Sequence, residues 1–198
     1  MHSEEKAGFV KTNYNNDNVN PESRQKIMSF PSRKLPRLKG FDYGKNGAYF
    51  ITICSYEKKH LYGEIKNGEM YLSRIGEIIN GEILNIQIRY NNIRIDKYVI
   101  MPNHIHMIIS ISDAEGINPF PTKKNDISNV VGKFKAGVTR SVGNAFMHSE
   151  KTEMWQRSFH DHIIRNREDY DKIWEYIDTN PLKWELDCFY GSKKSYRR

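Results

Sequence analysis

Hydrophobic and polar residues follow two different periods along the central part of the chain. Segments rich in β-branched and aromatic residues predict strands. Segments whose apolar side chains recur every three or four residues predict helices. The predicted strands span residues 48–54, 61–65, 70–72, 93–100, 104–112 and 159–164. The predicted helices span residues 73–89, 128–147 and 168–179.

Residues with special backbone preferences mark the ends of several of these segments. The pair Asn67-Gly68 between two short strands is typical of a hairpin turn. Ser73 is expected to be the N-cap of the first helix, and Pro181 to end the last one. This order of elements predicts an α+β fold, with an antiparallel sheet and helices mainly on one face.

The two ends of the chain differ from the centre in composition. Residues 1–30 are polar and show no periodicity, which predicts a disordered N-terminal extension. Residues 31–46 form a basic arm, and residues 47–184 are expected to form the ordered domain. Residues 185–198 are predicted to be a basic C-terminal tail. The cations of the arm that could lie along phosphates are Arg33, Lys34, Arg37 and Lys39.

The overall charge narrows the range of partners. Among 198 residues, 31 Lys and Arg face 24 Asp and Glu, which gives a net charge of +7. This excess favours a polyanion, most simply a nucleic acid, although a basic protein without such a partner remains an alternative. Cys54 and Cys188 form no metal or disulfide motif, which fits a reducing cytoplasm. Neither a membrane span nor a signal peptide is expected.

Two histidines two residues apart are the first candidate for chemistry. His104 and His106 open the apolar segment that ends near Ile111. If this segment is a strand, both imidazoles lie on one face, and the alternate residues from Ile105 onward lie on the other. Imidazoles placed in this way can bind one divalent metal. Exposed or hydrogen-bonded histidines are the alternative reading of the same spacing.

The last predicted helix carries a tyrosine outside its apolar stripe. The stripe that is expected to face the core consists of Tyr170, Ile173, Trp174 and Ile177. Tyr176 lies about 110° from its centre, and Asn180 follows one turn later on the same edge. A hydroxyl and an amide oxygen are thus available beside the core. The alternative reading is a half-buried surface tyrosine and an asparagine that caps the helix.

Three motifs in fixed order resemble the REP-associated tyrosine transposases, a branch of the single-tyrosine HUH transposases. They are Val99–His106, Trp155–Asn166 and Tyr176–Pro181. The resemblance runs from about Gly47 to Trp184. It implies a ferredoxin-like sheet that carries the histidines, with the tyrosine helix docked beside it.

The resemblance also assigns roles to the candidate residues. It implies that His104 and His106 bind a divalent metal, Mg²⁺ or Mn²⁺, and that Tyr176 is the nucleophile. Asn180 occupies the third ligand position, where mobile insertion-sequence relatives have glutamine. The implied reaction is the cutting and joining of single-stranded DNA at hairpins through a 5′-phosphotyrosine. The residues that are then expected to contact the DNA, besides those of the arm, are Lys133, Lys135, Arg140, Arg157, His162 and Arg165.

Two other functions remain open at this point. A nucleic-acid-binding protein that recognises hairpins without cutting them would have the same basic surface. A metal-dependent hydrolase could instead use the second pair, His160 and His162, together with the first around one zinc. The sequence leaves open whether the protein acts as a monomer or a homodimer.

Overall fold

The computed structural model describes residues 46–112, 126–146 and 153–190. The predicted extension 1–30 lies outside these residues, as do the basic arm except for Asn46 and the end of the C-terminal tail. No helix in the described part of the chain combines the length and the apolar composition needed to cross a bilayer.

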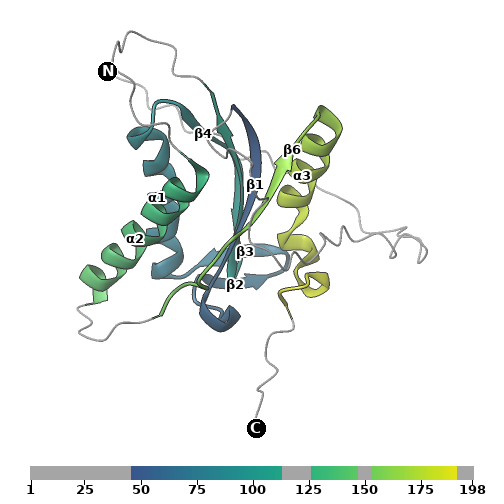
Figure 1. Ribbon diagram of the computed structural model, residues 1–198. Coiled ribbons are helices and arrows are strands. Elements are labelled where there is room, and N and C mark those ends of the chain that lie inside the picture. The colour runs from purple at the N-terminus through teal and green to yellow at the C-terminus, as the bar shows by residue number, and fades with distance from the viewer. Residues whose placement is uncertain (1–45, 113–125, 147–152, 191–198) are drawn as a thin grey trace, which may run out of the picture. The chain divides into compact units, whose positions relative to one another are not determined.

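Four strands form the main sheet, in the spatial order β4-β5-β1-β6 (Figure 1). They are β1 (Gly47–Cys54), β4 (Ile93–Ile100), β5 (His104–Ile111) and β6 (His160–Ile164). Every neighbouring pair is antiparallel. In chain order the sheet therefore reads second, third, first, fourth, which is the ferredoxin-like arrangement expected from the sequence.

A short excursion separates β1 from the first helix. It contains the 3₁₀ turn η2 (Tyr56–Lys58) and a hairpin of β2 (Gly63–Lys66) and β3 (Glu69–Leu72). The turn of this hairpin has positive φ at Asn67 (53°) and Gly68 (76°), as an Asn-Gly hairpin turn requires. The predicted hairpin is thus confirmed.

Two long helices lie on one side of the sheet and a third lies on the other (Figure 1). The first two are α1 (Arg74–Arg89) and α2 (Ile127–Phe146), which pack on each other, and α1 also contacts β4. The third is α3 (Arg167–Thr179), which contacts β4 and β5 and continues into the 3₁₀ segment η3 (Pro181–Leu186). The Ser73 side chain accepts a hydrogen bond from the Gly76 amide, so the predicted N-cap is correct.

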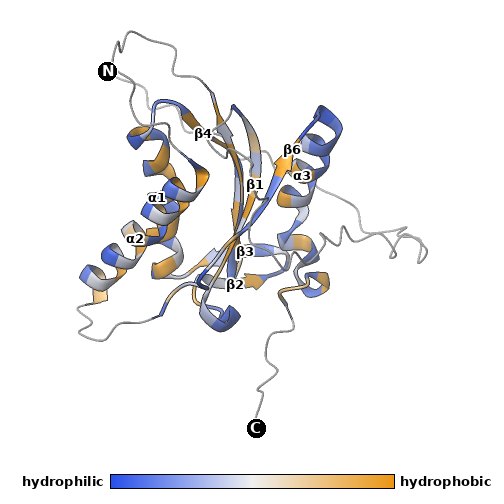
Figure 2. Ribbon diagram, in the orientation of Figure 1, coloured by the Kyte–Doolittle hydropathy of each residue, from blue (hydrophilic) through white to orange (hydrophobic). Residues whose placement is uncertain are grey.

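The main hydrophobic core lies between the sheet and the pair α1 and α2. Alternate residues of β1 and β5 supply its sheet side, and α1 and α2 supply the rest. Figure 2 shows that α3 is more hydrophilic than these two helices. The most deeply buried members of the core include Ile51, Ile53, Ile79, Ile83, Ile105, Met107, Ile109, Ile127 and Val138.

The predicted apolar stripe of α3 is only partly buried. Ile173 and Ile177 are fully buried, but the side of the helix that carries Trp174 faces solvent, and this residue remains 37% exposed. The Lys97 ammonium lies 5.0 Å from the centre of the Trp174 ring, so the indole contacts a cation where a core contact was expected. The prediction of Trp174 as a core residue is therefore wrong.

Candidate active site

The pleat of β5 turns His104 and His106 toward α3, away from the main core. The two side chains are 0% and 2% exposed, and their ring centroids lie 4.4 Å apart. On the neighbouring strand Thr52 is paired with His106, and Cys54 with His104. The predicted placement of both imidazoles on one face is thus observed.

Each imidazole is held by a hydrogen bond at Nδ1. The Oδ1 atom of Asn103 lies 2.8 Å from His104 Nδ1. The Asn103 amide nitrogen donates to the carbonyl oxygens of Lys58 and Phe189, so its Oδ1 can only accept. His104 must therefore donate from Nδ1, which leaves its Nε2 unprotonated and with a lone pair available to a ligand. That Nε2 atom is buried without a hydrogen-bond partner.

His106 is held in a similar way and is kept neutral by burial. Its Nδ1 lies 2.8 Å from the Thr52 hydroxyl, and its ring stacks on Phe50. Burial lowers the pKa of His106 to about 3 and also lowers the pKa of His104. Both rings are thus neutral near pH 7, which is the form that binds metal ions.

Tyr176 projects from α3 toward the same histidine. Its hydroxyl lies 3.3 Å from His106 Nε2 and donates to Asp187 Oδ2 at 3.3 Å. The ring meets those of His106 and Phe50 edge-on. Burial, assisted by the negative charge of Asp187, raises the pKa of Tyr176. The phenol is therefore protonated, fixed in orientation and adjacent to the histidine pair.

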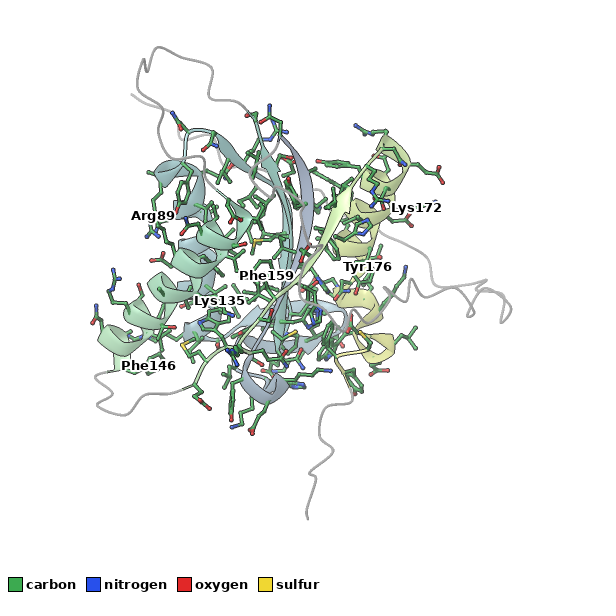
Figure 3. All side chains as sticks on the ribbon, viewed as in Figure 1. Arg89, Lys135, Phe146, Phe159, Lys172 and Tyr176 are labelled. Atoms are coloured by element: carbon green, nitrogen blue, oxygen red, sulfur yellow. The ribbon has the colours of Figure 1, made fainter. Side chains whose placement is uncertain are left out.

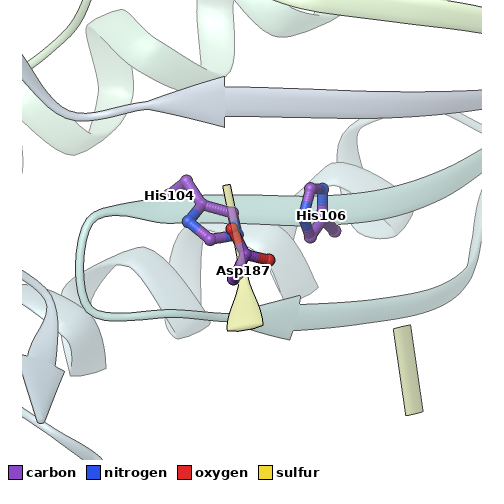
Figure 4. Close-up of side chains that lie close together, drawn as sticks. All are labelled: His104, His106 and Asp187. Carbon is purple, nitrogen blue, oxygen red and sulfur yellow. The ribbon is translucent and has the colours of Figure 1, made fainter. Parts of the chain in front are cut away.

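Two residues with side-chain oxygen atoms complete the cluster around the histidines and Tyr176. Asn180 lies at the end of α3, and Asp187 lies in the segment after it. Asn180 is 2% exposed and donates from Nδ2 to Asp187 Oδ2 at 3.2 Å, while its Oδ1 is buried without a partner. His104, His106 and Asp187 each offer one ligand atom, and these atoms all lie within 4.8 Å of one another (Figure 4). Such a set of imidazole and oxygen donors can hold a divalent cation.

Asp187 is the residue of this cluster that the sequence pattern did not indicate. It lies seven residues after Asn180, within the stretch predicted to be a basic tail. The 3₁₀ turn after Pro181 folds the chain back, and the Phe189 amide then donates to Asp187 Oδ1 at 2.7 Å. The Phe189 ring covers His104 at a centroid distance of 4.4 Å. The only sequence signal for Asp187 as a site residue was that a carboxylate follows the tyrosine helix at a short distance.

Residues 47–180 match the family described as Transposase IS200 like. The chain belongs to this family. An uncharacterized protein of Haemophilus influenzae is 39% identical over 170 residues, which span 80% of this chain and 93% of that protein. The REP-associated tyrosine transposase of Escherichia coli (strain K12) is 23% identical over 141 residues, or 71% and 70% of the two chains.

A solved structure shares the fold of this IS200-like transposase. It is a REP-associated tyrosine transposase bound to a REP hairpin, with a TM-score of 0.55 and 21% sequence identity. The match covers 77% of this chain and 76% of that one. The family resemblance and the fold expected from the three motifs are thus confirmed.

Among the residues that the structure describes, the cations predicted to contact DNA are not gathered in one place. Lys133, Lys135 and Arg140 lie on α2, across the sheet from the histidines. Figure 3 shows Lys135 and Tyr176 on these two sides. The Lys135 ammonium donates to the carbonyl oxygen of Gln156 at 2.7 Å, and burial lowers its pKa. Arg33, Lys34, Arg37 and Lys39 lie outside the described residues.

The predicted contacts on and near β6 are spread along that strand. Arg157 precedes β6 and Arg165 follows it, and both are exposed. His162 Nε2 lies 2.8 Å from Asp169 Oδ2, which ties β6 to the first turn of α3. Across the described ranges, the group of side chains able to share a metal ion contains neither His160 nor His162. A single zinc held by both histidine pairs is therefore not supported.

Proposed function

We propose that this transposase cuts and joins single-stranded DNA at hairpins, with Tyr176 as the nucleophile. Attack forms a bond between the Tyr176 oxygen and phosphorus and breaks the bond from phosphorus to the 3′ oxygen. The products are a 5′-phosphotyrosine and a 3′ oxygen that takes up a proton from water to become a free 3′-OH. This hydroxyl can reverse the reaction without ATP. The observation that carries this proposal is the short distance between the Tyr176 hydroxyl and the buried histidine pair. The hydroxyl lies 3.3 Å from His106 Nε2.

The chain's own residues prepare the tyrosine for this step. The edge-on contacts with His106 and Phe50 fix the ring, and the hydroxyl donates to Asp187 Oδ2. In our proposal this carboxylate accepts the phenolic proton as the new bond forms. A proton acceptor is needed because burial raises the pKa of Tyr176.

We further propose that the cluster holds Mg²⁺ or Mn²⁺. Two buried atoms, His104 Nε2 and Asn180 Oδ1, have no hydrogen-bond partner, and a cation would satisfy both. His106 and Asp187 would supply further ligands. When bound, the ion acts as a Lewis acid on a non-bridging phosphate oxygen. A pair of imidazoles favours Mn²⁺ over Mg²⁺, whereas the amide and carboxylate oxygens suit both ions.

The hairpin substrate is proposed from a relative. A REP-associated tyrosine transposase of the same fold has been solved with a REP hairpin. The net charge of +7 supports a polyanionic substrate, and raised salt should weaken its binding steeply. A single strand beside the hairpin is required in this proposal because the scissile phosphate has to reach the buried histidines.

The proposal is tested by trapping the covalent intermediate. Purified protein is incubated with Mn²⁺ and labelled hairpin oligonucleotides drawn from the repeats beside its gene, then run on a denaturing gel. We expect a labelled band that migrates with the protein and is absent with Tyr176→Phe. Cleavage that persists in Tyr176→Phe would contradict the tyrosine mechanism and indicate attack by water. Tight binding without cleavage of either strand of the repeats would instead favour the non-cleaving alternative.

A further inference from the structure

A second polar site lies on the α3 side of the sheet, at the end remote from the histidines. It is a pocket of about 470 Å³ between the sheet and the first turn of α3. Three arginines line it: Arg94 from β4, and Arg165 and Arg167 on either side of the α3 N-cap. None of the site residues described above lies in this pocket except Arg165.

Strand register places this pocket in line with the histidines. Arg94, Ser110, Ala48 and Ile164 are neighbours in one row across β4, β5, β1 and β6. Thr52, which holds His106, is four residues further along β1 than Ala48. An even number of residues keeps both positions on one face, and four residues of a strand span about 13 Å.

The acidic residue of the pocket, Asp96, is already paired with an arginine and two hydroxyl groups. The Asp96 side chain is 4% exposed, and its Oδ1 accepts from Arg94 Nε at 2.5 Å. Its Oδ2 accepts from the hydroxyls of Ser110, at 2.5 Å, and Tyr170, at 3.0 Å. Both carboxylate oxygens are therefore occupied within the protein. The Arg94 side chain remains 72% exposed at the pocket.

The other two arginines add positive charge that is not fully neutralised. Arg167 pairs with Asp171 through Nε but keeps 83% of its side chain exposed. Arg165 is exposed and has no recorded hydrogen bond or ion pair with any residue that the structure describes. Counting Asp171, the partner of Arg167, three arginines face two aspartates at the pocket, which leaves an excess of one positive charge.

We propose that this pocket binds one phosphate of the DNA strand whose scissile phosphate lies at Tyr176. A guanidinium group can donate two parallel hydrogen bonds to two oxygens of one phosphate. A pocket lined by arginines is therefore suited to bind a phosphodiester. This inference rests on the proposed function, because it assumes that a single strand reaches the histidines. About 13 Å corresponds to roughly four nucleotides at about 3.4 Å each, or to fewer if the strand is extended.

The test measures binding rather than cleavage, so it does not depend on the chemistry. Every protein carries Tyr176→Phe. The probes are one hairpin oligonucleotide with its single-stranded flank and a series of copies, each with one phosphate replaced by a neutral methylphosphonate. The variants are Arg165→Ala and, as a matched control, Arg140→Ala. Arg140 is also an exposed arginine, but it lies on α2 across the sheet.

We expect a loss of affinity of about tenfold when a single phosphate, two to four nucleotides from the scissile one, is made neutral. Arg165→Ala should weaken binding of the unmodified probe by a similar factor and abolish the sensitivity at that phosphate. It should also lower the number of counterions released on binding, as measured from the salt dependence of the affinity, by about one. Arg140→Ala should leave the sensitivity at that phosphate unchanged.

Each other result overturns a distinct statement. If Arg165→Ala keeps the sensitivity at that phosphate, the pocket does not bind the strand and the inference is wrong. If no protein binds the hairpin probe, the proposed function itself fails. If the affected phosphate lies more than about four nucleotides away, the two sites do not share one strand in the way proposed.

Discussion

The two faces of the sheet are made from alternating residues of the same strands, yet they differ in almost every physical respect. Toward α1 and α2, β5 presents Ile105, Met107 and Ile109, which pack in a continuous core. Toward α3 it presents His104 and His106, which are just as buried but polar. A strand can thus carry stability on one side and chemistry on the other, because neighbouring side chains point in opposite directions.

The polar face needs a different kind of stabilisation. A buried polar group without a partner costs free energy, so the histidines are held by Thr52 and Asn103. Even so, His104 Nε2 and Asn180 Oδ1 remain without hydrogen-bond partners. These are the two atoms that the proposed metal ion would satisfy, whereas the apolar face of β5 has no polar side-chain atom to satisfy.

The largest expected effect comes from removing the imidazoles of the polar face. His104→Ala with His106→Ala should reduce DNA cleavage by about a thousandfold or more, because the proposed metal ion would contribute several kcal/mol to transition-state stabilisation. Mn²⁺ binding, followed by calorimetry, should be lost, while hairpin binding should largely persist. Full cleavage by the double variant would show that the metal site lies elsewhere.

The matching change on the apolar face should affect stability. Ile105→Ala removes a fully buried side chain from the position between the two histidines. It should lower the free energy of unfolding by about 2–5 kcal/mol, as measured by urea denaturation. Among molecules that remain folded, Mn²⁺ affinity should be close to that of the unchanged protein. If Ile105→Ala lost Mn²⁺ binding as completely as the double histidine variant, the proposed division of roles between the two faces would be wrong.

The sequence predicted those features that depend on local periodicity. Alternation in β5 separated His104 from Ile105, and the 3.6-residue period placed Tyr176 beside the buried stripe of α3. The same period was misleading at Trp174, because it indicates which residues share a helix side but not how wide a strip the sheet covers. Trp174, predicted to be a core residue, therefore lies against Lys97 and is partly exposed to solvent.

Features that depend on distant segments could not be predicted in this way. Asp187 reaches Tyr176 only because η3 reverses the chain after Pro181. The arginine pocket needs the register that puts Arg94 of β4 in one row of the sheet with Ile164, the last residue of β6 before Arg165. In both cases the residues carry no local motif, and only the folded sheet brings them together.

The smallest effect, and the one that compares the faces most directly, is the dependence of stability on pH. Burial holds the pKa of His106 at about 3 and lowers that of His104, whereas in the unfolded chain a histidine has a pKa of about 6.5. Below about pH 6.5 the unfolded chain therefore takes up protons that the folded protein does not. Stability is full above this pH and falls as the pH decreases, by about 2 kcal/mol for His106 between pH 7 and pH 5, with a contribution of the same sign from His104.

Three metal-free proteins, kept in chelator, separate this contribution from all others. Urea denaturation between pH 7 and pH 5 should show the full decrease for the unchanged protein. Ile105→Ala should be less stable at every pH but show the same decrease, because it removes no titrating group. The double histidine variant should show a smaller decrease, by about 2 kcal/mol for the loss of His106 and by a further amount for the loss of His104, because the buried imidazoles no longer resist protonation. Equal slopes in all three would mean that the histidines are accessible to protons, and the polar face would then not be the closed site that the contacts describe.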